Sequence, residues 1–267
     1  MPRLILCADD FALSRPISET IASLAADGRI NAISCMSVCQ GWDRDSELLR
    51  DLPSSIQIGL HVTLTDEQPL TAGIGIAEEG KLPSLRVLTR QARRWRLPLY
   101  SVADELAAQF SRFEEAMGRP PAFVDGHQHV HSLPGIRQVF LEEAARRAPD
   151  AWVRDCMDRP TSICSRPFPG KAIASALHSQ GLKRDAALHR LQCNDSFAGH
   201  YDFGERFATL FPQFLRRPGR RHLVMCHPGA GRLAGDAIAD ARPREAAALR
   251  KLPVADIAAY YGMEFRA

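Results

Sequence analysis

Long apolar runs are absent from this 267-residue sequence, and none approaches the ~20 residues that a membrane-spanning helix requires. The seven cysteines include no Cys-x-x-Cys pair, and several lie in apolar runs, where a free thiol behaves as a small hydrophobic group. Residues Arg3 to Cys7 read as a buried strand, too short for the apolar region of a signal peptide. We therefore predict a cytoplasmic protein with reduced cysteines and no membrane span.

A dense basic block with interleaved aromatics is also missing, and the formal net charge is only +3. The composition therefore gives no sign of a nucleic-acid partner. One local exception is a group of four arginines: Arg90, Arg93, Arg94 and Arg96. We interpret this group as a solvated surface, with contact to a phosphorylated or acidic substrate as the alternative. Trp95 and Tyr100 lie in the same region, where they would either stack on a sugar ring or pack against the fold.

Short apolar runs alternate with amphipathic stretches, a pattern typical of βα units. The predicted strands cover residues 4–8, 32–38, 56–61, 122–124, 152–154 and 222–226. Helices are expected from about Ser14, over 102–117, from Pro134, near 171–189 and around 207–214. No repeat, low-complexity segment or linker divides the chain. We predict one α/β barrel domain over residues 1–267, with an insertion at approximately 65–98 over the barrel mouth.

Polar motifs follow four of the predicted strands. They are Ala8-Asp9-Asp10-Phe11, Gly59-Leu60-His61, Asp125-Gly126-His127-Gln128-His129-Val130-His131 and Met225-Cys226-His227-Pro228-Gly229. In a parallel barrel the carboxyl ends of the strands meet at one mouth, where catalytic groups collect. Two adjacent carboxylates there are costly to bury unless a cation pairs with them, and histidines from other strand ends would complete a two-histidine, one-carboxylate metal site.

The direction of each side chain limits these roles. Asp9 and Asp10 point in opposite directions on a strand, so they would serve different functions unless the chain turns between them. His127, His129 and His131 follow one another at period two and would share one face of an extended segment. Taken singly, an Asp-Asp pair is more often a turn and a lone histidine more often structural, but four strand ends together favour a metal site. The remaining histidines are interpreted as surface or core residues: His178, His189, His200 and His222.

These segments, with Leu4–Phe11 and Ile58–His61 extending the first two, resemble the signatures of the YdjC-like carbohydrate deacetylases. That family includes chitooligosaccharide deacetylases and hopanoid-associated deacetylases. The segment Gly199-His200-Tyr201-Asp202-Phe203 is also similar to the family pattern. The resemblance implies a distorted (β/α) TIM-like barrel of the glycoside hydrolase/deacetylase type. It implies a hydrolase that removes the N-acetyl group from a small-molecule acetylated amino sugar.

The resemblance also implies roles for particular residues. One divalent metal ion would be held by Asp10, His61 and His127, with magnesium or zinc expected first and cobalt or manganese as alternatives. Asp9 would be the general base and His227 the general acid. The chain departs from the family pattern at three positions: Ala12, Gly126 and Gln128. A non-glycine residue at position 12 argues against a positive φ angle there.

Further polar residues are candidates for supporting roles. Arg154 would orient Asp9 by a charge-assisted hydrogen bond, or else form a structural ion pair. Asp125 would fix the ring tautomer of a metal-binding histidine. His129, His131 and Tyr201 are assigned to substrate binding or to support of the metal ligands.

Two other functions and a homo-oligomer remain open. The first is a different metal-dependent amide or phosphoester hydrolase on the same barrel, which would need two bridged metals and a carboxylated lysine or extra aspartates. A carboxylated lysine would have to point inward, whereas we interpret all four lysines of the chain as peripheral: Lys81, Lys171, Lys183 and Lys251. The second is a non-catalytic metal- or sugar-binding protein, which would have no need of both Asp9 and His227.

Overall fold

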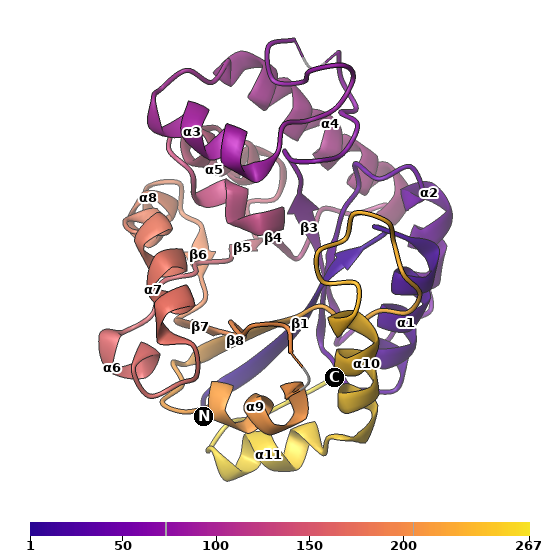
Figure 1. Cartoon of the computed structure of the whole chain (residues 1–267), viewed down its shortest axis with the longest axis vertical. Coiled ribbons are helices and arrows are strands. Elements are labelled where there is room, and N and C mark those ends of the chain that lie inside the picture. Colours follow the sequence, from indigo (N-terminus) through magenta and orange to yellow (C-terminus); the bar gives the residue numbers. More distant parts are fainter. Residues whose placement is uncertain (73, 205) are drawn as a thin grey trace.

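A curled parallel sheet of eight strands forms the centre of the computed structural model, which describes residues 1–72, 74–204 and 206–267 (Figure 1). Its strand order is β6-β5-β4-β3-β2-β1-β8-β7. The strands are β1 (Arg3–Phe11), β2 (Ala32–Cys35), β3 (Gln57–Val62), β4 (Phe123–Gly126), β5 (Trp152–Val153), β6 (Gln192–Cys193), β7 (Ser196–Ala198) and β8 (Arg221–Cys226). The α/β fold, a distorted TIM-like barrel, confirms the predicted class.

The longest strand, β1, lies between β2 and β8 and is buried along eight of its nine residues. Strands of a parallel sheet are covered on both faces, so they are nearly continuous runs of apolar residues and do not alternate. Leu4, Leu6 and Ala8 join one core cluster, whereas Ile5 and Cys7 join another. This is why the positions of the longer strands along the chain could be predicted from short apolar runs.

The two edges of the sheet are joined by only two residues, Asn194 and Asp195. They connect β6, which pairs with β5, to β7, which pairs with β8. The Asn194 side chain accepts a hydrogen bond from the Asp155 amide at 2.7 Å and donates one to the Asp155 carbonyl at 2.8 Å. One segment therefore changes partner halfway along its length, which distorts the barrel. Two such short strands carry no periodic pattern, so the sequence did not predict them.

Helices cover the outside of the sheet (Figure 1). They are α1 (Arg15–Ala26), α2 (Trp42–Asp45), α3 (Leu85–Arg93), α4 (Leu99–Met117), α5 (Ile136–Arg147), α6 (Pro160–Ile163), α7 (Pro169–His178), α8 (Leu182–Leu188), α9 (Phe207–Phe214), α10 (Ala241–Lys251) and α11 (Val254–Tyr260), with the 3-10 helices η1 (Ser46–Leu49) and η2 (His127–Ser132). The single helix expected near 171–189 is in fact two, α7 and α8. The first helix ends at His178, with Ser179 as its C-cap, and Gly181, at φ +84°, is the N-cap of the second.

The proposed insertion at 65–98 follows the carboxyl end of β3 and contains α3. Within it Gly73 lies outside the described residues. Asp66, Glu67 and Lys81 from this stretch line the cavity at the barrel mouth. Among the described residues, no helix is both long enough and apolar enough to cross a bilayer.

Candidate active site

The carboxyl ends of β1, β3, β4 and β8 open onto one cavity of about 790 Å³. That volume suits a small-molecule ligand. Its walls include most of the residues that the sequence singled out: Asp9, Asp10, His61, His127, His129, Tyr201 and His227. The parallel topology thus brings together residues that are up to 218 positions apart in the sequence.

A sharp turn at the end of β1 directs both aspartates toward this cavity. Asp10 has φ +69° and Ala12 has φ +76°, and the pairing of β1 with β2 shifts register between Ala8 and Phe11. The expectation that Ala12 avoids a positive φ angle is wrong. Alanine has the smallest side chain that carries a Cβ atom, and the Ala12 amide gains a hydrogen bond to Ser18 Oγ at 3.0 Å. Such a conformation costs an L-residue about 1–2 kcal/mol.

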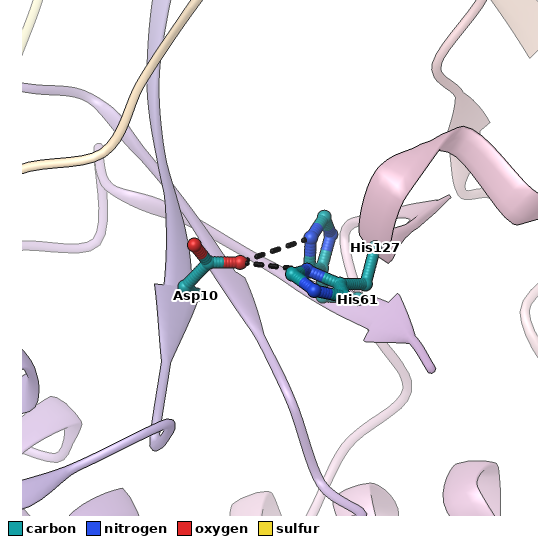
Figure 2. Close-up of side chains that lie close together, drawn as sticks. All are labelled: Asp10, His61 and His127. Carbon is teal, nitrogen blue, oxygen red and sulfur yellow. Dashed lines mark hydrogen bonds and ion pairs between the residues drawn. The ribbon is translucent and has the colours of Figure 1, made fainter. Parts of the chain in front are cut away.

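Asp10, His61 and His127 converge on one point (Figure 2). Asp10 Oδ1 lies 2.9 Å from His127 Nδ1 and 3.5 Å from His61 Nε2. One ligand atom from each of the three residues lies within 4.8 Å of the other two. Two imidazole nitrogens and a carboxylate oxygen are a donor set that suits zinc, cobalt, manganese or magnesium. The residues therefore fit a divalent cation, although its identity is not fixed by them.

Neighbouring charges hold the groups of this cluster in defined states. Burial raises the pKa of Asp10, but Arg242 and His127 outweigh it and hold that pKa well below its ordinary value. Burial lowers the pKa of His61, whereas Asp125 and Asp10 raise it to about 10. Because the Asp125 carboxylate lies 2.6 Å from His61 Nδ1, it fixes the ring so that Nε2 faces Asp10.

Asp9 lies on the other side of the cluster and is held by Arg154. The guanidinium donates two hydrogen bonds of 2.6 Å to Asp9, one to each carboxylate oxygen, and its Nη2 also lies 2.5 Å from Asp125 Oδ2. Arg154 is fully buried, and these two carboxylates supply the negative charge that such burial requires. Cys7, Asp9 and Asp125 also form a group with metal-ligand spacing, but the Arg154 guanidinium is already bound to both of its carboxylates.

The segment that carries three histidines at period two is not extended. It forms η2, and Gln128 and His129 have φ angles of +53° and +60°. As a result the three side chains point in different directions. His127 faces Asp10 and His129 lines the cavity, whereas the buried His131 donates a hydrogen bond from Nε2 to the Arg154 carbonyl at 2.9 Å. The prediction of one shared face is therefore wrong.

His227 is fixed through its backbone by a residue that the sequence analysis missed. Its amide donates a 2.6 Å hydrogen bond to Oε2 of the fully buried Glu245 on α10, and the Tyr201 hydroxyl donates to Oε1 of the same carboxylate. The His227 ring lies 3.9 Å from Asp9, measured from Nε2 to Oδ2. Tyr201 is therefore linked to the His227 backbone through the Glu245 carboxylate, without a direct bond between them.

A second residue of α10, Arg242, was also missed. Its Nη2 donates to Asp10 Oδ2 at 2.8 Å, and its Nε donates to Asp236 at 2.6 Å. Gly229, in the His-Pro-Gly motif, allows this approach, because a Cβ atom there would lie 2.9 Å from Ile17 and 3.2 Å from Arg242. Because α10 lacks a regular apolar pattern, the sequence did not indicate that Arg242 and Glu245 would be buried.

Other residues lie where the sequence analysis did not expect them. His200, which was interpreted as a surface or core residue, lines the cavity with its ring centroid 6.1 Å from that of His129. Lys81 and Lys171 also line the cavity and are not peripheral, although Lys171 donates its hydrogen bond to the Tyr201 carbonyl. Trp95 and Tyr100 neither line this cavity nor pack in the core, since both side chains are exposed.

The fold and this site define a parallel α/β barrel with a candidate metal centre at its mouth. The chain belongs to the YdjC-like protein family, whose model matches residues 3–259, which confirms the resemblance found in the sequence. A chitooligosaccharide deacetylase of Klebsiella pneumoniae (strain 342) is 29% identical over 225 residues, which cover 84% of this chain and 81% of that protein.

Two solved structures share the fold. A protein of Enterococcus faecalis V583 named for cellobiose-phosphate cleavage matches with a TM-score of 0.75 and 20% identity, over 99% of this chain and 96% of its own. An uncharacterized protein of Agrobacterium tumefaciens C58 matches with a TM-score of 0.55 and 12% identity, over 100% of this chain and 87% of its own. At these identities the two structures support the architecture alone.

Proposed function

We propose that this protein is a metal-dependent deacetylase that hydrolyses the N-acetyl group of an acetylated amino sugar. The observation that carries the proposal is the convergence of Asp10, His61 and His127 beside a separate carboxylate, Asp9, and a cavity-facing histidine, His227. Membership of the YdjC-like family and the name of the Klebsiella relative support the same activity.

Asp10, His61 and His127 would hold the cation. When bound, a divalent cation polarises an amide carbonyl and lowers the pKa of water towards neutrality. Arg242 keeps one oxygen of Asp10 engaged, so Oδ1 is the oxygen that faces the two histidines. Asp125 keeps the His61 ring turned for the same purpose.

Asp9 would act as the general base. Its two oxygens accept hydrogen bonds from Arg154, which favour the charged form of the carboxylate and fix its orientation. The side chain lines the cavity, so it can take a proton from a water molecule that attacks the acetamide. Arg154 would then stay positively charged and limit the movement of Asp9 during the reaction.

His227 would protonate the departing nitrogen, since an amine is a poor leaving group without a proton. The ring faces the cavity close to Asp9, and Glu245 fixes the backbone from which it projects. Phe203 packs edge-to-face with this ring, with centroids 5.6 Å apart and planes at 75°. Asp9 and His227 would thus both promote cleavage of the same amide C–N bond, consistent with amide hydrolysis.

The substrate would be a small acetylated sugar. The cavity volume of about 790 Å³ and its mixture of polar and apolar lining residues suit about one or two sugar rings. The name of the relative makes N-acetylglucosamine oligomers the first substrates to test. The polar residues of the 65–98 insertion that line the cavity, Asp66, Glu67 and Lys81, would contact the sugar hydroxyls.

Release of acetate from a panel of N-acetylated sugars, with and without a chelator, tests the proposal. A deacetylase should release acetate, lose the activity with chelator, and regain it when one of the four candidate metals is added back. Hydrolysis of p-nitrophenyl phosphate without acetate release would favour the phosphoesterase alternative. Sugar binding by calorimetry without any turnover would favour the non-catalytic alternative.

A further inference from the structure

Trp95 occupies a position that is unfavourable for it. It follows the end of α3, where its amide bonds to the Ala92 carbonyl at 3.1 Å and the Arg96 amide bonds to the Gln91 carbonyl at 3.0 Å. This pair of bonds is a Schellman motif, in which the left-handed residue is usually glycine. Trp95 has φ +53°, a conformation that is rare for a bulky residue.

Burial does not compensate for this conformation. Trp95 is 72% exposed, whereas the other two tryptophans of the chain, Trp42 and Trp152, are buried. A large aromatic side chain that contributes little to the core and adopts a strained backbone is best explained by contact with something outside the chain.

The surroundings of Trp95 are strongly basic. The four arginines predicted to form a surface are indeed exposed: Arg90, Arg93, Arg94 and Arg96. Among the described residues none of them forms an ion pair with a carboxylate. Their positive charge is therefore available to an anionic partner.

Exposed apolar side chains also lie on α4, which follows α3 in the chain, and on α7, which contacts the end of α3. Tyr100, at the start of α4, is 81% exposed. On α7, Ile173 and Leu177 are 46% and 67% exposed and lie one turn apart on the same face. Arg93 Nη2 lies 2.8 Å from His178 Nε2, so the ends of α3 and α7 are in contact. We use the name Trp95 surface for four apolar residues and four arginines together: Trp95, Tyr100, Ile173, Leu177, Arg90, Arg93, Arg94 and Arg96.

Helix α7 also reaches the active-site cavity, because Lys171 in its first turn lines that cavity. The helices α3 and α7 lie on the same flank of the barrel (Figure 1, upper and middle left).

We propose that the Trp95 surface docks the protein on an anionic lipid bilayer as a peripheral contact. Tryptophan and tyrosine favour the boundary between water and lipid, and arginines are attracted to anionic headgroups. A second copy of the chain fits less well, because four arginines on each copy would repel one another. An acidic peptide would satisfy the arginines but would leave the aromatic and aliphatic side chains without a partner. The docking is independent of the reaction in the cavity.

Tryptophan fluorescence of the whole protein, mixed with lipid vesicles, tests this proposal. Because Trp42 and Trp152 are buried, a blue shift on binding would report on Trp95. The shift is expected with vesicles of phosphatidylcholine and phosphatidylglycerol and not with phosphatidylcholine alone. Trp95→Gly should raise the melting temperature, because glycine suits the left-handed position. The same variant should bind anionic vesicles at least tenfold more weakly in a co-sedimentation assay. Its turnover of a soluble substrate should be unchanged.

The double variant R94Q/R96Q should bind anionic vesicles roughly 30-fold more weakly, since each cationic side chain near such a surface contributes about 1 kcal/mol, or about fivefold. R250Q/K251Q removes the same charge from the exposed end of α10 and should bind as the unaltered protein does. Absence of binding, or equal weakening in both double variants, would overturn the proposal. A dimer in sedimentation velocity that Trp95→Gly abolishes would instead identify a second copy as the partner.

Discussion

Replacing Asp9 by Asn tests the division of roles between the two adjacent aspartates. The change preserves the size of the side chain and removes its negative charge. In the structure Asp9 accepts two hydrogen bonds from Arg154, whereas the three candidate metal-ligand atoms all belong to other residues. We therefore expect Asp9→Asn to retain the metal and to lose the reaction.

The structure sets the size of both effects. A general base typically contributes about 10²–10⁴-fold to a rate, so turnover should fall by at least ~100-fold. The Asn oxygen can still accept one bond from Arg154, and Arg154 keeps its contact of 2.5 Å with Asp125. The folded state thus loses one hydrogen bond between charged groups, which costs about 1.5–3 kcal/mol. That loss should leave the protein folded at 25 °C.

Acetate release measures the rate, and metal titration by calorimetry measures the affinity. Asp10→Asn is the matched control, because it changes the neighbouring carboxylate to the same amide. It should lose metal affinity and activity together. If Asp9→Asn lost the metal as Asp10→Asn does, or if it retained full activity, the assignment of Asp9 as the base would be wrong.

Three further predictions follow from the contacts around the site and the core. Asp125→Asn should weaken metal affinity by about 10–100-fold in a metal titration, because it releases His61, and unchanged affinity would contradict this. Glu245→Gln should lower turnover without changing metal affinity, because an amide cannot accept bonds from both His227 and Tyr201; equal losses of both would count against a role through His227. Burial lowers the pKa of His222 from 6.5 to about 3, so its contribution to stability is present above pH 6.5 and declines as the pH falls towards 3. His222→Gln should reduce the slope of unfolding free energy against pH by up to about 1.4 kcal/mol per pH unit over that range in urea titrations, and an unaltered slope would refute the assignment.

The order of strands and helices could be predicted because it depends on local patterns. Buried parallel strands are short apolar runs, and amphipathic helices such as α1 and α4 repeat their apolar residues every three or four positions. A parallel barrel then places every strand's carboxyl end at one mouth. Asp9, Asp10, His61, His127 and His227 could therefore be brought together without coordinates.

Local patterns could not predict where the chain departs from regular structure. The left-handed turn at Asp10 and Ala12 lets adjacent aspartates share a cavity, and left-handed residues in η2 divide three evenly spaced histidines. Neither position holds the glycine that usually marks such a turn. Trp95 is another left-handed residue without glycine, and the sequence predicted instead that it stacks on a sugar ring or packs against the fold.

Partners from distant segments were equally beyond the sequence. Arg242 and Glu245 lie on a helix more than 230 residues after Asp10, and their burial becomes favourable only when the fold supplies Asp10, Asp236, Tyr201 and the His227 amide. The amino-acid sequence thus determined the barrel and the strand ends that carry its chemistry, because burial and periodicity are local properties. Only the tertiary structure decided which charges are buried together, because the free energy of a buried charge depends on neighbours that the chain order does not specify.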